Sequence, residues 1–381
     1  MIYKSAVSAA ESKTRIMIMA GGTGGHIFPA LTIAGVLQKQ HHANVLFLGS
    51  VRGMEHDLVS KAGFKLYTVT AERIYGTRLL KTLWSSLHMV FAMLQSFRLF
   101  RKIKPELVVS MGGFVAAPGG LAARLLGIPL VIHEQNATAG MTNRLLVRFA
   151  SSVLQAFPNV FAAKYHPQLV GNPVRQEILS IPEPALRYAQ RTGPLRVLVI
   201  GGSQGALMLN RLLPCVFKKL NMSLSIWHQT GTKSLNMTRQ FYQRLEIEAK
   251  TESFIDDMAA AYAWADFVIC RSGALTVSEL YIAGLPALFI PFPHAVYNHQ
   301  YHNAQSMVKL GAAICIEQKQ ATVTNTAEQL QQFLLEQPDP RMHLLSRAKL
   351  ARNLAFPKAH HAIAQLCVDL VHQHKLSRSI N

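Results

Sequence analysis

Short apolar runs alternate with stretches of helical periodicity from Arg15 onward. Uninterrupted apolar strands separated by helices are typical of parallel sheets that are covered by helices on both faces. The sequence therefore predicts a doubly wound α/β protein. The candidate strands are Ile16–Ala20, Asn44–Leu48, Lys65–Val69, Leu107–Ser110, Leu130–His133, Ser152–Leu154, Leu195–Ile200, Ser223–His228, Phe267–Cys270, Ala287–Ile290 and Ala313–Ile316.

The two halves of the chain begin with the same pattern. In the first, an apolar run leads into the glycine turn Gly21–Gly25, and an apolar helical pattern starts after Pro29. In the second, Gly201–Ala206 follows an apolar run and precedes a helix from Leu207. Because 381 residues favour two domains, we predict two Rossmann-like domains. The predicted boundaries are an extension over 1–14, domains over 15–172 and 173–355, and a C-terminal helix and tail over 356–381 that packs back toward the first domain.

The glycine turns are candidate ligand sites. A strand, a glycine turn and a helix together point backbone N–H groups at an anionic or polar ligand. Neither turn has the P-loop ending or the GxGxxG spacing, so a tight turn without a ligand is the alternative. A third cluster, Met111–Gly120, also follows a predicted strand, and it contributes Gly113 and Phe114 as further candidates. In an open parallel sheet, ligands bind beyond the carboxyl ends of the strands.

Polar side chains follow several of these strands. His26 ends the first turn, where a phosphate site needs no histidine but proton transfer does. His133–Asn136 follows another apolar run and includes Glu134; a hydrogen-bonded loop is the alternative. Ser272 is predicted to cap a helix that begins with Ala274–Thr276 and faces a diphosphate. Glu279 on that helix could accept hydrogen bonds from a ribose diol, or be a solvated carboxylate.

A histidine-rich segment lies between Pro291 and Asn303. No nearby Asp, Glu or Cys joins its histidines, and the chain has no Asp-x-Asp, so we predict no metal and no cofactor. The amides of Gln300 and Asn303 suit sugar hydroxyls better.

Lys and Arg total 39 against 20 Asp and Glu, a net charge of +19, which favours an anionic partner. The four cysteines are far apart, which indicates free thiols in a reducing compartment. The sequence predicts neither a signal peptide nor a membrane-spanning helix.

The segment 73–104 is basic, contains no acid and is rich in large apolar residues. A core-facing helix with a solvated basic face explains Leu87 and Phe91. The preceding residues predict a patch that meets an anionic membrane surface. Nucleic acid would also match the charge, but no nucleic-acid-binding motif is present. The patch residues are Ile74, Tyr75, Leu79, Leu80, Lys81, Leu83 and Trp84.

Together these motifs resemble one family closely, the undecaprenyldiphospho-muramoylpentapeptide β-N-acetylglucosaminyltransferases of bacterial peptidoglycan synthesis. The resemblance spans nearly the whole chain. Its motifs are GGTGGHIFPAL (21–31), MGGFVAAPGG (111–120), HEQN (133–136), GNPVR (171–175), GGSQGA (201–206), FIDDMAAAYAWADFVICRSGALTVSE (254–279) and HQYHNA (299–304).

The resemblance implies a GT-B glycosyltransferase whose two domains face each other across a cleft. The first domain would receive lipid I and meet the inner membrane from its cytoplasmic side, and the second would hold UDP-N-acetylglucosamine. Transfer to the 4-hydroxyl of the muramoyl sugar would invert the anomeric centre, release UDP and need no metal. The matching donor positions are Thr23, Gly24, Gly25, Asn136, Arg175, Ser203, Ile255, Ala274, Leu275, Thr276, Val277, Ser278, Glu279 and Gln300.

Within this scheme we expect His26 to be the base for the acceptor hydroxyl, and the Gly201 turn to stabilise the departing diphosphate. Asn303, Glu134, Gly113 and Phe114 are further candidates for the cleft. Two alternatives are a UDP-N-acetylglucosamine 2-epimerase of the same architecture and a non-catalytic nucleic-acid-binding protein.

Overall fold

The structure is a computed structural model that describes residues 13–51, 53–71, 79–189, 191–336 and 339–380, with the backbone alone at 79–87 and 380. The chain forms two compact units, which are described separately. The first unit contains residues 1–133, 141–153 and 361–381, and the second contains 134–140 and 154–360.

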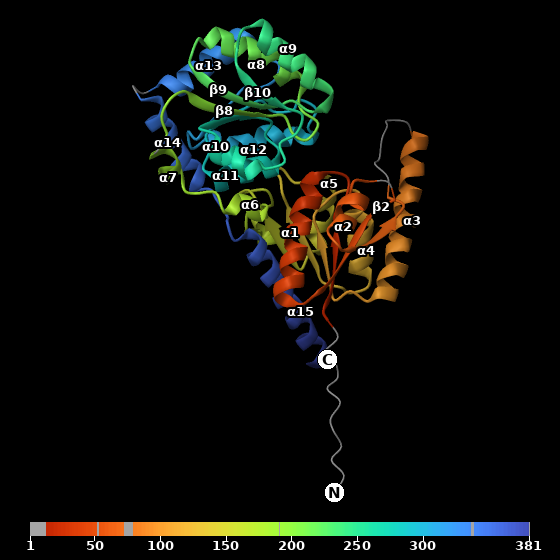
Figure 1. The fold of residues 1–381 in the computed structure, drawn as a ribbon. Helices are drawn as coiled ribbons and strands as arrows, with labels where there is room; N and C mark the ends of the chain where they lie inside the picture. Colours follow the sequence, from red (N-terminus) through yellow and green to blue (C-terminus); the bar gives the residue numbers. More distant parts are fainter. Residues whose placement is uncertain (1–12, 52, 72–78, 190, 337–338, 381) are drawn as a thin grey trace. The chain divides into compact units, whose positions relative to one another are not determined.

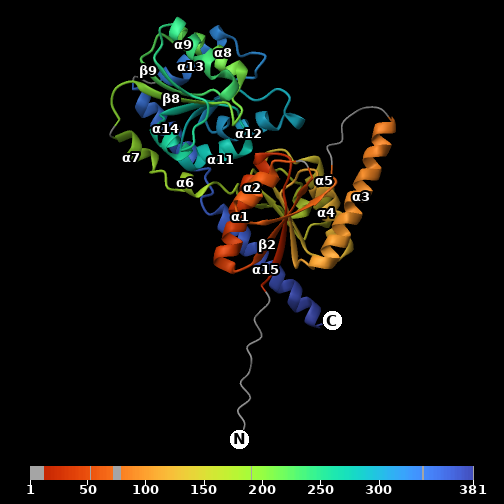
Figure 2. The ribbon, with the colours of Figure 1, turned by 45° about the vertical axis from the view of Figure 1, so that its right-hand side comes forward.

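The first sheet has the strand order β3-β2-β1-β4-β5-β6-β7. Its strands are β1 (Arg15–Met19), β2 (Asn44–Ser50), β3 (Lys65–Val69), β4 (Leu107–Ser110), β5 (Leu130–Glu134), β6 (Ser152–Gln155) and β7 (Gln168–Leu169). The helices of this part of the chain are α1 (Gly24–His41), α2 (Glu55–Lys61), α3 (Leu79–Ile103), α4 (Ala116–Leu125), α5 (Met141–Leu146) and the 3-10 helices Val147–Phe149 and Ala163–Tyr165. The strands of the first unit lie between α1 on one side and α3 and α4 on the other (Figure 2).

The second sheet has the order β10-β9-β8-β11-β12-β13, which repeats the order around β1. Its strands are β8 (Leu195–Ile200), β9 (Leu224–Gln229), β10 (Ala249–Glu252), β11 (Phe267–Cys270), β12 (Ala287–Phe289) and β13 (Ala313–Cys315). The helices are α6 (Gln176–Leu179), α7 (Pro184–Ala189), α8 (Leu207–Leu220), α9 (Leu235–Arg244), α10 (Met258–Trp264), α11 (Ala274–Ala283), α12 (His299–Val308), α13 (Val323–Leu335), α14 (Pro340–Arg352) and the 3-10 helices Thr232–Ser234 and Val296–Asn298.

The strands of the second sheet supply two hydrophobic cores. Successive side chains of a strand point to opposite faces. Val197 and Val199 therefore join a core with α8 and α13, whereas Leu198 and Ile200 join a core with α11. Figure 1 shows α8, α9 and α13 on one face of this sheet and α10, α11 and α12 on the other. Burial on both faces explains why the central strand β11 is an uninterrupted apolar run, and the doubly wound prediction is confirmed.

The last helix, α15 (Ala359–Ile380), contributes most of its length to the first unit. Ile363, Cys367 and Val371 are buried along one side of this helix. Polar contacts from its exposed side include an ion pair of Lys375 with Glu106 and hydrogen bonds of His361 with Gln40 and of Arg378 with the carbonyl of Gly127.

Several element predictions were wrong in detail. The helix after the first glycine turn begins at Gly24, before Pro29, so two glycines and His26 belong to the helix. Pro184 is the first residue of α7, a position that proline favours, and no helix was predicted there. The strands β7 and β10 were missed because both are short and polar.

Candidate functional site

The first candidate site lies in the first unit, after β1. This strand pairs with β2 on one side and β4 on the other, so the strand order reverses here. Reversal points of parallel sheets are where ligands bind. The helix α1 starts directly after the turn, and its N-cap, Thr23, makes no side-chain cap. The N–H of His26 donates to the carbonyl of Thr23, so the N–H groups of Gly24 and Gly25 are the ones that suit a polar or anionic ligand.

His26 lies in the first turn of α1. Its Nδ1 is 3.1 Å from the carbonyl oxygen of Gly21 and 3.4 Å from Oγ1 of Thr23. A carbonyl only accepts, so Nδ1 carries the proton and donates it, and Nε2 of the neutral ring carries a lone pair. This Nε2 lies beside the backbone of Gly112, 3.3 Å from the position that a Cβ there would take. The geometry gives His26 the tautomer that a base at Nε2 requires.

The predicted candidates from the third glycine cluster lie against the same turn. Gly113 has a φ of +84°, and a Cβ at this position would be 2.5 Å from the carbonyl oxygen of Gly21. No residue with a side chain fits there without strain. The Phe114 ring lies beside Gly22. The structure thus brings Thr23, Gly24, Gly25, His26, Gly113 and Phe114 together.

Sequence reasoning missed a carboxylate beneath this turn. Glu55, the first residue of α2, is fully buried and accepts hydrogen bonds from the N–H and Oγ of Ser50 at 2.7 and 2.6 Å. Burial tends to raise the pKa of Glu55, but hydrogen bonds from Ser50, from its own N–H and from Gly22 outweigh burial and lower it. The sequence does contain a signal for Glu55, because an acid that closely follows a strand is a candidate site residue. Polar residues were considered after other strands but not after β2.

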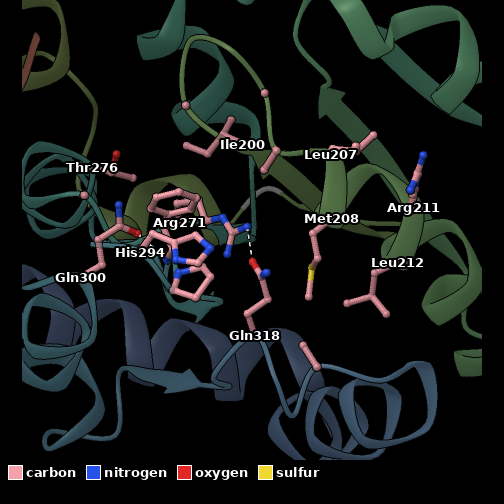
Figure 3. Close-up of a pocket in the computed structure, with 18 of the residues that line it drawn as sticks. Ile200, Leu207, Met208, Arg211, Leu212, Arg271, Thr276, His294, Gln300 and Gln318 are labelled. Carbon is pink, nitrogen blue, oxygen red and sulfur yellow. Dashed lines mark hydrogen bonds between the residues drawn. The ribbon is translucent and has the colours of Figure 1, made fainter. Parts of the chain in front are cut away.

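The second candidate site is a cavity of about 910 Å³ in the second unit. It lies at the carboxyl ends of β8 and β11, where the order of the second sheet reverses. Figure 3 shows Arg271, His294, Gln300 and Gln318 on one side, and Met208, Arg211 and Leu212 on the other. Its wall also includes Gly201, Gly202, Gly205, Ala206, Leu207, Gly273 and Thr276.

Two helix N-termini reach this cavity. The N-cap of α8 is Ala206 and that of α11 is Gly273; neither offers a side-chain cap. The prediction that Ser272 caps α11 was wrong, because this serine is buried one residue before the N-cap. Uncapped N–H groups at two helix ends favour a ligand with negative charge. A diphosphate meets that requirement.

Arg271 adds a cation to the cavity wall. Its Nη1 donates to the carbonyl oxygens of Ile290 and Pro291 at 2.8 and 2.9 Å, and its Nη2 donates to Oε1 of Gln318 at 2.6 Å (Figure 3). Burial lowers the pKa of Arg271, which nevertheless stays charged near neutrality. The three bonds hold the guanidinium in one orientation toward the cavity.

Glu279 is neither exposed nor alone, so its alternative interpretation as a solvated carboxylate was wrong. Its Oε1 accepts from Nε and Nη2 of Arg175 at 3.2 and 3.0 Å, and its Oε2 accepts from the hydroxyl of Tyr262 at 3.0 Å. Burial raises the pKa of Glu279, although Arg175 and Tyr262 counteract it. Both partners fix the carboxylate, and Oε2, which accepts a single hydrogen bond, keeps a lone pair for a ligand hydroxyl.

Asn303 and Asn136 form a second fixed group. Asn303 is fully buried; its Oδ1 accepts from the N–H of Ala137 at 2.7 Å, and its Nδ2 donates to Asn136 and to the carbonyl of Ser272. Glu134 accepts from the N–H groups of Asn136 and Gly140 at 3.1 and 3.0 Å. Asn303 and Glu134 therefore hold loops in place, and their side chains face protein groups.

The other predicted donor residues have different surroundings. Gln300 lines the cavity and accepts from the N–H of Phe292 at 2.9 Å. Ser203 is exposed on the Gly201 turn, outside the cavity wall. The N–H of Ile255, which is buried, donates to Gln229 at 2.9 Å. On α11, Ala274 and Leu275 are partly exposed, whereas Val277 and Ser278 are buried.

The predicted membrane patch lies outside the residues whose side chains the structure describes. Within the described part of α3, Ala92, Ser96 and Phe100 are buried, whereas Phe91 is 51% exposed, so its assignment to a core-facing side was wrong. Val90 and Leu94 are exposed beside it. Among the described residues no helix is long and apolar enough to cross a membrane, and no group of His, Cys, Asp and Glu could hold a metal ion. The four cysteines, all described, are free.

Both units match known protein domains. Residues 16–155 match the glycosyltransferase family 28 N-terminal domain, and residues 196–363 match its C-terminal domain. Two switch-point sites on two such domains define a sugar-nucleotide glycosyltransferase of the GT-B fold.

Curated relatives and a solved structure extend this result. The chain is 44% identical over 355 residues to the UDP-N-acetylglucosamine–N-acetylmuramyl-(pentapeptide) pyrophosphoryl-undecaprenol N-acetylglucosamine transferase of Coxiella burnetii, covering 93% of this chain and 98% of that one. It is 46% identical over 351 residues to the Yersinia pseudotuberculosis enzyme of the same name, covering 92% and 96%. The crystal structure of Acinetobacter baumannii MurG superposes with a TM-score of 0.82 at 38% identity, covering 93% of this chain and 99% of that one. The chain belongs to this family of N-acetylglucosamine transferases.

Proposed function

We propose that this protein transfers N-acetylglucosamine from UDP-N-acetylglucosamine to the 4-hydroxyl of the muramoyl sugar of lipid I, which yields lipid II and UDP. The observation that carries the proposal is the cavity of the second unit, where two uncapped helix N-termini and Arg271 meet. In a chain of this family, that cavity suits the diphosphate of the donor. The Arg175–Glu279 pair suits its ribose diol.

The reaction requires a base and a stabilised leaving group. The 4-hydroxyl oxygen bonds to C1 of the donor sugar, while the bond from C1 to the diphosphate oxygen breaks and leaves its electron pair on UDP. The hydroxyl proton passes to Nε2 of His26, whose Nδ1 already donates to Gly21. Attack opposite the leaving group inverts C1 and gives a β-1,4 linkage. Backbone N–H groups and Arg271 stabilise the negative charge on UDP.

A direct assay tests the proposal. The purified protein is mixed with UDP-N-acetylglucosamine and a lipid I analogue, with and without EDTA, and disaccharide and UDP are quantified. We expect one UDP per disaccharide and no dependence on EDTA. A UDP-sugar isomer formed without acceptor would instead indicate a 2-epimerase. A UDP-GlcNAc 2-epimerase from Neisseria meningitidis shares the fold at a TM-score of 0.63 and 12% identity.

His26→Ala tests the base. We expect kcat to fall by about 10² to 10⁴, the usual contribution of a positioned base. The matched control is His41→Ala at the other end of α1, which should leave kcat unchanged. Near-normal kcat in His26→Ala would refute the base assignment without affecting the transfer reaction itself.

We further propose that the protein works as a peripheral protein on the cytoplasmic face of the bacterial inner membrane, where lipid I would be met. The net charge of +19 and the exposed Val90, Phe91 and Leu94 of α3 support this proposal. Sedimentation with vesicles that contain anionic lipid should remove the protein from solution. Neutral vesicles or high salt should abolish most of this binding. Equal binding to neutral vesicles would contradict an electrostatic contribution.

A further inference from the structure

Glu55 is held under the first glycine turn by a close-fitting cage. A Cβ at Gly53 would be 2.1 Å from its Oε2, and a Cβ at Gly49 would be 2.6 Å from its Cγ. Oε1 takes both hydrogen bonds from Ser50, which leaves Oε2 directed at the turn. The carboxylate therefore has one position and one orientation.

From this position, Glu55 reaches His26 through a single peptide group. Oε2 accepts from the N–H of Gly22 at 3.4 Å. The carbonyl of that same peptide, Gly21 C=O, accepts from Nδ1 of His26 at 3.1 Å. Hydrogen bonds in such a chain polarise one another, so a negative charge at the N–H end makes the carbonyl a stronger acceptor.

We propose that Glu55 is a positioning residue for the transfer reaction, acting on His26 through the Gly21–Gly22 peptide group. It fixes the orientation of that peptide, holds the proton of His26 on Nδ1 and makes Nε2 a better base. This inference rests on the proposed role of His26. In many sites a carboxylate orients a histidine by direct contact; here a peptide group stands between the two.

The ionisation state of Glu55 agrees with this role. Its lowered pKa keeps the carboxylate charged at neutral pH, although the group is buried. The elements next to the turn carry further titratable groups, which include His56 and Asp57 on α2 and His133 and Glu134 on β5. His56 places Nε2 3.2 Å from the carbonyl of Ser50, and His133 is buried at the end of β5. A pH profile must separate their contributions from that of Glu55.

Glu55→Gln is the decisive variant. Its amide group offers one acceptor where the carboxylate offers two, so either Gly22 or Ser50 loses its partner, and the charge is gone in both cases. We expect kcat to fall about tenfold to a hundredfold, the range typical of a lost second-layer partner of histidine. The acidic limb of the kcat/KM profile should move to lower pH. In a His26→Gln background, Glu55→Gln should lower kcat by less than about a further twofold. The relay, which is the chain of hydrogen bonds from Glu55 through the Gly21–Gly22 peptide group to His26, then has no base to act on.

The tautomer of His26 gives a readout that is independent of catalysis. Nitrogen-15 NMR of the ring, assigned by comparison with His26→Gln, should show the Nδ1–H form in the wild type and a larger Nε2–H fraction in Glu55→Gln. Gly53→Ala should act in the same direction, because its methyl group displaces Oε2 while the charge is retained.

Two matched controls separate the relay from a structural effect. Ser50→Ala removes a hydrogen bond that lowers the pKa of Glu55 but leaves Oε2 on Gly22, so it should lower the melting temperature and leave the tautomer unchanged wherever Glu55 stays ionised. His56→Asn should leave the tautomer and the pH profile unchanged. An unaltered tautomer and pH profile in folded Glu55→Gln would overturn the relay. Normal kcat in His26→Gln would instead overturn the base assignment, and the NMR result would still decide whether the relay exists.

Discussion

His228 is uncharged in the folded protein, so the stability of the second unit should fall in acid. This side chain is fully buried on β9; its Nε2 is 3.0 Å from Oδ1 of Asn210, and its Nδ1 is 2.9 Å from the hydroxyl of Tyr242. An amide oxygen only accepts, so Nε2 donates and Nδ1 accepts from Tyr242. Both ring nitrogens are satisfied in the neutral form. Desolvation lowers the pKa of His228 to about 3.

The sign and size of the effect follow from linkage. Between about pH 3 and 6.5 the unfolded chain binds a proton at His228 that the folded chain does not, so stability falls as pH falls through this window. The slope is about 1.4 kcal/mol per pH unit, and the full difference is roughly 5 kcal/mol. Above the unfolded pKa of 6.5 the contribution is constant.

Urea unfolding at a series of pH values from 7 to 5 measures this slope. In a Trp84→Phe background, the remaining tryptophans Trp227 and Trp264 report on the second unit, since their rings lie 5.5 Å apart there. His228→Gln removes the titrating group, so the free energy of unfolding should lose about 1 kcal/mol per pH unit of its pH dependence. His372→Gln, on α15 of the first unit, should keep the slope. An identical slope in wild type and His228→Gln would refute the reasoning.

Two further outcomes concern the sites. Gly113→Ala should destabilise the first unit by more than about 1 kcal/mol and lower kcat, because its Cβ would meet Gly21. The control is Gly35→Ala in α1, where a Cβ would have nothing within 4 Å, and this variant should stabilise the unit. Equal melting temperatures for the two variants would contradict this account. Glu279→Gln should raise KM for the donor about tenfold to a hundredfold with little change in kcat, as expected for the loss of a charged hydrogen bond that is present throughout the reaction. Discrimination against a 2′-deoxyribose donor should weaken in that variant, and unchanged discrimination would assign Glu279 to the Arg175 ion pair alone.

The alternation of apolar runs was enough to predict the architecture. A strand buried on both faces is an uninterrupted apolar run, as Phe267–Cys270 is, and this signal does not depend on tertiary context. Edge strands lack it. Ala249–Glu252 is polar and only half-buried, so nothing in its sequence distinguishes it from a loop.

The candidate sites were predictable where the backbone conformation requires a particular residue type. The turns at Gly21 and Gly201 contain glycines because the backbone there has a positive φ or lies close to other atoms. Hydrogen bonds between residues that are distant in the sequence produce no such signal. Neither the Glu55 contact with Gly22 nor the network around Asn303 can be read from spacing, because the folded sheet alone brings those residues together. A lone glutamate has the same appearance in sequence whether it is buried or solvated.

The division of the chain between the units constrains the order in which the protein can be completed on the ribosome. The first unit needs α15, whose Ile363, Cys367 and Val371 are buried in it, yet residues 154–360 are synthesised in between and belong to the second unit. The second unit can therefore fold as soon as residue 360 has left the exit tunnel, whereas the first is complete only when α15 has followed. A nascent chain stalled before residue 359 would expose apolar surface of the first unit that α15 otherwise covers. Apolar surface that is exposed in this way during synthesis is prone to aggregation until α15 covers it.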